Sequence, residues 1–217
     1  MNQAILGFAV MEGLYSVLLI LAAFLLGSCP CAVWLGRLFL KKDITGYGDG
    51  NPGSANVFRA GGMKLGLAAV LLDILKGVPF VYMSHAVFDM SIGITVAVGL
   101  GAILGHAFSP LLRFKGGKSI AVTFGVIVAL PQADVLLFFT LLMVLGFIFI
   151  EQHSWVVIPA PLGTLVYLLL NRGTSWEVLF MLCVLVLYII KQYDGLRTPP
   201  RFKVNILNWI QSRSRAA

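Results

Sequence analysis

Two glycine-rich stretches contain the residue types that could bind a phosphate group. The first runs Gly48-Asp49-Gly50-Asn51-Pro52-Gly53-Ser54-Ala55-Asn56-Val57-Phe58-Arg59. Glycine accepts positive φ angles, so successive backbone N–H groups can converge on an anion. The guanidinium of Arg59 could add a bidentate contact to such an anion. The alternative is an ordinary surface loop, because glycine interrupts loops of every kind.

The second stretch is Arg113-Phe114-Lys115-Gly116-Gly117-Lys118-Ser119. Its Gly-Lys-Ser ending resembles a Walker motif, but position 112 is leucine where that motif needs glycine, and no strand precedes it. A P-loop nucleotide site is therefore excluded. The remaining interpretation is an anion site built from the two glycine N–H groups, the two lysines and a helix N-terminus near Ser119.

Three further polar residues lie within apolar sequence. Asp73 and Lys76 are three residues apart, which places them on one helix face, either as a self-neutralising ion pair or with Lys76 as a substrate contact. His106 is a candidate general base, with a buried hydrogen-bonded histidine as the alternative. The sequence has no Gly-x-Ser-x-Gly motif, so no catalytic nucleophile is assigned.

The composition indicates the class of protein that must position these residues. Of the 217 residues, 59% are hydrophobic and 12% are charged, and the mean hydropathy is +0.93. Globular domains have roughly 45–50% apolar and about 25% charged residues. A soluble domain, a disordered chain and a disulfide scaffold are therefore excluded. The net charge of +7 does not indicate nucleic-acid binding, because so little polar surface remains.

The apolar segments predict an all-α integral membrane protein with seven transmembrane helices, because a bilayer core needs about 20 apolar residues per helix. The predicted spans are Ile5–Leu26 with an amphipathic continuation to Leu40, Leu65–Met83, Ile92–Leu112, Ser119–Leu130, Val135–Ile150, Val156–Leu170 and Val178–Ile190. The last four are short and must be sheltered by neighbouring helices.

The distribution of lysine and arginine predicts the orientation. With the N-terminus outside, fourteen basic residues fall on inner segments and one, Arg172, falls on an outer segment. The positive-inside rule then places the C-terminus and both glycine-rich stretches at the cytoplasmic face. We expect one transmembrane domain over residues 1–195 and a basic cytoplasmic tail over residues 196–217.

In collinear order, these motifs resemble those of the bacterial acyl-phosphate-dependent glycerol-3-phosphate acyltransferases. Leu26-Gly27-Ser28 with Pro30 and Arg37 is similar to LGSxP and its basic residue, and the Gly48 to Arg59 stretch is similar to GSGNxGATNxxR. Asp73 to Gly77 resembles LDxLKG, and Gly105-His106 with Phe114 to Lys118 resembles GH followed by FKGGK.

The resemblance implies a multi-pass enzyme of the bacterial inner membrane with a cytoplasmic active face. It would transfer a fatty acyl group from acyl phosphate to glycerol 3-phosphate, giving lysophosphatidic acid in membrane lipid synthesis, without cofactor, metal or nucleic acid. The reaction would be substrate-assisted. The implied substrate-binding residues are Gly48, Asp49, Gly50, Asn51, Gly53, Asn56, Arg59, Lys76, Lys115, Gly116, Gly117 and Lys118.

The sequence departs from the family pattern at several hydroxyl positions. Asp49 stands where the pattern has serine, Ala55 replaces a threonine, and Val157 replaces the second serine of a motif resembling SLAS. Lys42 or Arg59 could neutralise Asp49. Two alternatives follow, namely an acyltransferase-like protein with a different phosphorylated acceptor and a non-catalytic lipid-binding relative.

Overall fold

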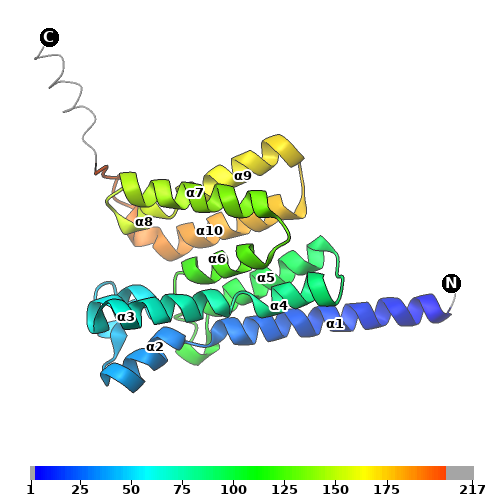
Figure 1. Cartoon of the computed structure of the whole chain (residues 1–217), viewed down its shortest axis with the longest axis horizontal. Helices are drawn as coiled ribbons and strands as arrows, with labels where there is room; N and C mark the ends of the chain where they lie inside the picture. The colour runs from blue at the N-terminus through cyan, green and yellow to red at the C-terminus, as the bar shows by residue number, and fades with distance from the viewer. Residues whose placement is uncertain (1–2, 204–217) are drawn as a thin grey trace, which may run out of the picture.

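The computed structural model describes residues 3–203 as a bundle of helices (Figure 1). The α-helices are α1 (Gln3–Ser28), α2 (Cys31–Leu35), α3 (Ser54–Leu75), α4 (Pro79–Tyr82), α5 (Ile92–Ala107), α6 (Ile120–Ala129), α7 (Ala133–Phe149), α8 (His153–Val156), α9 (Pro159–Arg172) and α10 (Trp176–Leu196). The longer helices lie roughly along one axis, and the start of α1 and the α9–α10 connection lie toward the end opposite α2 and α8.

Within residues 3–203, five helical segments are long and apolar enough to cross a membrane. They are Val10–Leu40, Ser54–Val87, Ile92–Leu112, His153–Arg172 and Trp176–Leu196. The two other predicted spans are the shorter apolar helices α6 and α7. With 10 residues, α6 is about 15 Å long, roughly half the thickness of a bilayer core. The all-helical fold is confirmed, and five of the seven predicted spans correspond to segments long and apolar enough to cross a membrane.

The second predicted span begins earlier than expected. We expected an irregular loop to residue 64, but α3 begins at Ser54 and carries Arg59 in its early turns. Val57, on this part of α3, is fully buried in a small core with Ala32, Val33 and Ile44. This tertiary packing stabilises a helix that local glycines disfavour. Gly62, with φ of 75°, bends the helix instead of ending it.

Glycines allow the helices to pack closely. A Cβ atom at Gly105 of α5 would overlap the carbonyl oxygen of Phe24 in α1, and one at Gly125 of α6 would overlap that of Ile74 in α3. Small residues at helix contacts are typical of membrane bundles, where backbone proximity supplies the packing energy. The early helices thereby form a tightly packed unit.

An ion-pair network joins α7, α9 and α10 at the end of the bundle away from the glycine-rich stretches. Arg172 Nη2 contacts Asp134 Oδ2, and its Nη1 lies 3.1 Å from Glu177 Oε1 and 2.9 Å from Gln132 Oε1. Tyr167 donates to Asp134 at 3.0 Å. The basic residue predicted on the outer side is therefore neutralised by carboxylates and holds three helices together.

Candidate active site

A cavity of about 1280 Å³ lies between the two glycine-rich stretches, helix α8 and the end of helix α10. Its polar lining includes four cationic side chains, Arg59, Lys115, Lys118 and Lys191. Its apolar lining includes Val70, Ile74, Phe124, Phe139, Met143 and Phe147. One cavity thus offers cations to an anionic group and an apolar wall to a hydrocarbon chain.

The first stretch is organised around the Asp49 carboxylate. Asp49 Oδ2 lies 2.8 Å from Lys118 Nζ, so its ionic partner is Lys118 and not Lys42 or Arg59. Asp49 Oδ1 accepts hydrogen bonds from Asn51 N and Asn56 Nδ2, both at 3.2 Å. Burial raises the pKa of the Asp49 carboxyl, but the hydrogen bond and charge of Lys118 outweigh it and leave the pKa below its ordinary value.

Asn56 connects this carboxylate to Arg59. The buried Asn56 side chain donates to Asn51 O at 2.8 Å and accepts from Arg59 Nη1 at 2.7 Å. Gly48 permits the arrangement because its φ is +56° and a Cβ there would lie 2.5 Å from Arg59 Nη1. The turn therefore links Arg59 to the Asp49 carboxylate through Asn56, while Lys118 pairs with that carboxylate directly.

The second stretch is held against the end of α5. Gly117 N donates to His106 O at 3.0 Å, and Cβ atoms at Gly116 or Gly117 would overlap the His106 backbone or ring. Lys191 of α10 donates to Ala107 O and to Gly116 O, both at 2.9 Å. These contacts fix the segment that presents Lys115 and Lys118. The helix expected after it is α6, which begins at Ile120.

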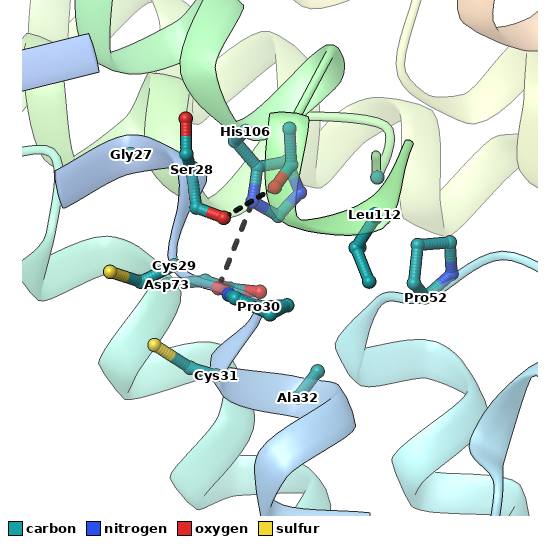
Figure 2. Close-up of a pocket in the computed structure, with 12 residues that line it drawn as sticks. Gly27, Ser28, Cys29, Pro30, Cys31, Ala32, Pro52, Asp73, His106 and Leu112 are labelled. Atoms are coloured by element: carbon teal, nitrogen blue, oxygen red, sulfur yellow. Dashed lines mark hydrogen bonds and ion pairs between the residues drawn. The ribbon is translucent and has the colours of Figure 1, made fainter. Parts of the chain in front are cut away.

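Behind the glycine-rich stretches lies a buried polar cluster (Figure 2). Asp73 Oδ1 is 3.8 Å from His106 Nδ1, the pair drawn in Figure 2. The same oxygen is 2.9 Å from Lys76 Nζ, and Lys76 also donates to Cys29 O at 2.9 Å. Asp73 and His106 line both the large cavity and a water-sized pocket of about 10 Å³ that is also lined by Ser28. His106 therefore reaches the cavity, while Lys76 is 5% exposed and tied to its neighbours.

The structure brings most of the predicted binding residues to one cavity. Those that line it are Asp49, Gly50, Asn51, Gly53, Arg59, Lys115, Gly116 and Lys118. Gly48 and Asn56 lie against Arg59, and Gly117 lies against His106. For Lys76, the contacts with Asp73 and Cys29 favour the ion-pair alternative over substrate contact.

Residues from the second half of the chain complete the cavity, and the sequence motifs did not predict them as site residues. His153, Ser154, Lys191 and Gln192 all line it, and Ser154 donates to the buried Gln192 at 3.1 Å. Their signal in the sequence is a polar side chain at the predicted inner end of an apolar span. That signal is weak by itself, because span ends are commonly polar.

The sequence model of the family described as glycerol-3-phosphate acyltransferase matches residues 17–197, most of the chain. This chain belongs to the glycerol-3-phosphate acyltransferase family. The resemblance seen in the glycine-rich motifs is confirmed, and the matched region contains every residue that lines the cavity except Thr198.

Individual relatives agree with this assignment. The glycerol-3-phosphate acyltransferase of Lactococcus lactis subsp. lactis (strain IL1403) is 35% identical over 182 residues, covering 80% of this chain and 83% of the relative. That of Streptococcus equi subsp. zooepidemicus (strain MGCS10565) is 31% identical over 201 residues, covering 89% of this chain and 93% of the relative. Both matches extend over most of this chain and most of the relative.

Two crystal structures of PlsY (YgiH), an integral membrane glycerol 3-phosphate acyltransferase, share this fold. The lysophosphatidic acid form is 27% identical and the glycerol 3-phosphate form 28% identical, each with a TM-score of 0.74. Each alignment covers 84% of this chain and 90% of the solved chain. The helical bundle described above is therefore the fold of an integral membrane acyltransferase family.

Proposed function

We infer that this protein transfers a fatty acyl group to glycerol 3-phosphate, giving lysophosphatidic acid for phospholipid synthesis. The observation that carries this function is the cavity in which Arg59, Lys115, Lys118 and Lys191 share a space with an apolar wall. An acyl chain fits against the wall, and phosphate groups fit at the cations. Family membership supplies the class of reaction.

We propose acyl phosphate as the donor. The acceptor hydroxyl oxygen attacks the carbonyl carbon, the bond from that carbon to the phosphate oxygen breaks, and inorganic phosphate leaves. Because the donor is already activated, the enzyme needs mainly to hold two phosphates close and align the hydroxyl with the carbonyl. A substrate phosphate takes the hydroxyl proton in this scheme, and His106, at the edge of the cavity, is the side-chain alternative as base.

The individual residues have distinct proposed roles. Arg59 and Lys118 bind phosphate, Lys115 adds positive charge at the exposed rim, and the N–H groups of Gly53 and Gly116 approach the ligand. Their loops bring these groups to one cavity, which supports the assignment. Asn56, Gly48 and Gly117 position Arg59 and the second stretch. Lys191 fixes that stretch through Gly116.

We propose that all seven apolar segments cross the inner membrane of a bacterial cell, with α6 and α7 shielded by longer helices. The N-terminus then lies outside, and the cavity with its cations opens at the cytoplasmic face. The distribution of basic residues supports this orientation. The basic tail proposed for residues 196–217 begins at the end of α10, and residues 204–217 lie outside the described part of the chain.

A reconstituted assay tests the reaction. Purified protein in lipid nanodiscs is mixed with palmitoyl phosphate and glycerol 3-phosphate, and lysophosphatidic acid and inorganic phosphate are measured together. We expect equal amounts of the two products and none when palmitoyl coenzyme A replaces palmitoyl phosphate. Turnover with the coenzyme A ester alone would contradict the donor assignment. Turnover only after glycerol 3-phosphate is exchanged for another phosphorylated alcohol would contradict the acceptor.

A further inference from the structure

The Asp49 carboxylate occupies the polar end of the cavity, beside the cation to which we assign phosphate binding. Its two oxygens face Lys118 at 2.8 Å and the donors of Asn51 and Asn56 at 3.2 Å. The Asp49 side chain is 44% exposed and that of Lys118 is 24% exposed. Solvent therefore reaches the ion pair, and Lys118 retains room to move to another anion.

The second phosphate-binding cation is organised by the same carboxylate. Asn56 donates its amide N–H to Asp49 and accepts from Arg59 at 2.7 Å. Arg59 and Lys118 line the same cavity, so a ligand with several anionic oxygens meets both cations in one space. The Asp49 carboxylate therefore lies where we expect the anionic group of a ligand to bind.

The apolar wall of the cavity makes the pairing of Asp49 with Lys118 important for ligand selection. A lysine beside an apolar wall of Phe124, Phe139, Met143 and Phe147 would accept any amphiphile with an anionic head group. Free fatty acids have that chemistry, and their carboxylate is the same group that Asp49 already presents. Exchanging one carboxylate for another at Lys118 gains no attraction, and it leaves Asp49 without its cation and facing a like charge.

A phosphate group differs from a carboxylate in charge and in the number of its oxygens. A phosphomonoester carries about −1.5 to −2 charges near pH 7 and three terminal acceptor oxygens. It can therefore contact Lys118 and Arg59 together and compensate for the displaced carboxylate. A ligand whose head group contacts Lys118 alone cannot compensate for the displaced Asp49 carboxylate.

We propose that Asp49 is an internal competitor for anions. It keeps Lys118 neutralised in the empty site and so lowers the affinity of every anion that depends on that lysine, including free fatty acid and the product inorganic phosphate. The inference rests on the proposed function, since it takes Lys118 and Arg59 as the phosphate-binding cations. A phosphate group that contacts Lys118 and Arg59 together compensates for part of this cost, whereas a carboxylate bound to Lys118 alone does not.

The test compares two carboxylate-to-amide variants of the same loop. Asp49→Asn retains an acceptor oxygen for Asn51 and Asn56 but removes the charge that pairs with Lys118. Asp43→Asn is the matched control, because Asp43 is exposed and its carboxylate accepts hydrogen bonds from the N–H and hydroxyl of Thr45. Both variants change the net charge of the loop equally.

Binding of radiolabelled palmitate to each purified protein in nanodiscs is the primary readout, and inhibition of turnover by inorganic phosphate is the second. An exposed ion pair contributes up to about 1 kcal/mol, which corresponds to about a fivefold change in affinity. We expect Asp49→Asn to bind palmitate about three to five times more tightly than the wild type. Its inhibition constant for inorganic phosphate should fall by a similar factor, while Asp43→Asn matches the wild type.

Unchanged palmitate affinity in Asp49→Asn would overturn the proposal, as would equal tightening in Asp43→Asn, which would indicate a general charge effect. Asp49→Ser provides a second removal of the charge if Asp49→Asn does not fold. The palmitate measurement needs no turnover. The two proposals can fail separately. If Asp49→Asn binds palmitate more tightly than the wild type but neither protein makes lysophosphatidic acid, the proposed reaction is contradicted and the competitor role of Asp49 is retained.

Discussion

The ammonium of Lys191, near the end of the last helix, donates a 2.9 Å hydrogen bond to the carbonyl oxygen of Gly116 in the second glycine-rich stretch. A second bond of the same length reaches Ala107 O. One side chain therefore joins the last helix α10 to the end of α5 and to the segment that carries Lys115 and Lys118. The geometry of the two lysines depends on a helix about 75 residues away in the sequence.

This linkage predicts a loss of both stability and activity in Lys191→Met. The variant keeps the length of the side chain but removes two charge-assisted hydrogen bonds, each contributing about 1.5–3 kcal/mol. We expect a lower midpoint of thermal unfolding and a raised KM for glycerol 3-phosphate. Lys64→Met, at an exposed position on α3, is the control. Equal behaviour of the two variants would show that Lys191 does not support the site.

The assignment of phosphate binding to the two cations predicts a large loss of affinity. Arg59→Ala and Lys118→Ala should each weaken binding of glycerol 3-phosphate by about 2 kcal/mol, or about 30-fold, measured by isothermal titration. Arg59→Lys should recover part of the loss, because it keeps the charge without the bidentate geometry. Wild-type affinity in both alanine variants would mean that these residues belong to ordinary solvated surface.

The close contact between Gly48 and Arg59 predicts that a side chain at position 48 displaces the Arg59 guanidinium. In Gly48→Ala, the new methyl group meets Arg59 Nη1 and Asn56 Oδ1 at 2.5 Å, and the positive φ adds about 1–2 kcal/mol of backbone strain. We expect the KM for glycerol 3-phosphate to rise about tenfold as Arg59 is displaced. Gly46→Ala is the matched control, because nothing lies within 4 Å of a Cβ there. The hypothesis fails if both alanine variants have the same KM.

The proposed topology predicts which introduced cysteines react from outside intact cells. In a background with Cys29, Cys31 and Cys183 replaced, Asp89→Cys should react with a membrane-impermeant maleimide, and Asp43→Cys should react only after lysis. Asp89 is preferred to Asp134, whose carboxylate pairs with Arg172. A C-terminal reporter should be cytoplasmic. Labelling of Asp43→Cys in intact cells would reverse the orientation.

The two glycine-rich stretches and their cations could be predicted from the sequence, because each is a local pattern with a fixed spacing. The all-helical membrane class likewise follows from apolar segments of sufficient length, which must satisfy their backbone hydrogen bonds internally. Helix positions in the interior were also predicted well, as in the case of Ile92–Leu112, which closely matches α5 with its following turn. Local composition and hydropathy determine all three features.

Only the tertiary structure decided how these patterns combine. Helix α3 starts at Ser54 because Val57 packs against residues more than ten positions earlier in the chain, a contact that no local propensity encodes. The ionic partner of Asp49 is Lys118, although Lys42 and Arg59 are nearer in the sequence. An ion pair depends on distance in space and not on separation along the chain. Lys191 joins the site for the same reason. The sequence alone specified the candidate phosphate-binding groups, and packing between distant helices determined which of them face one another.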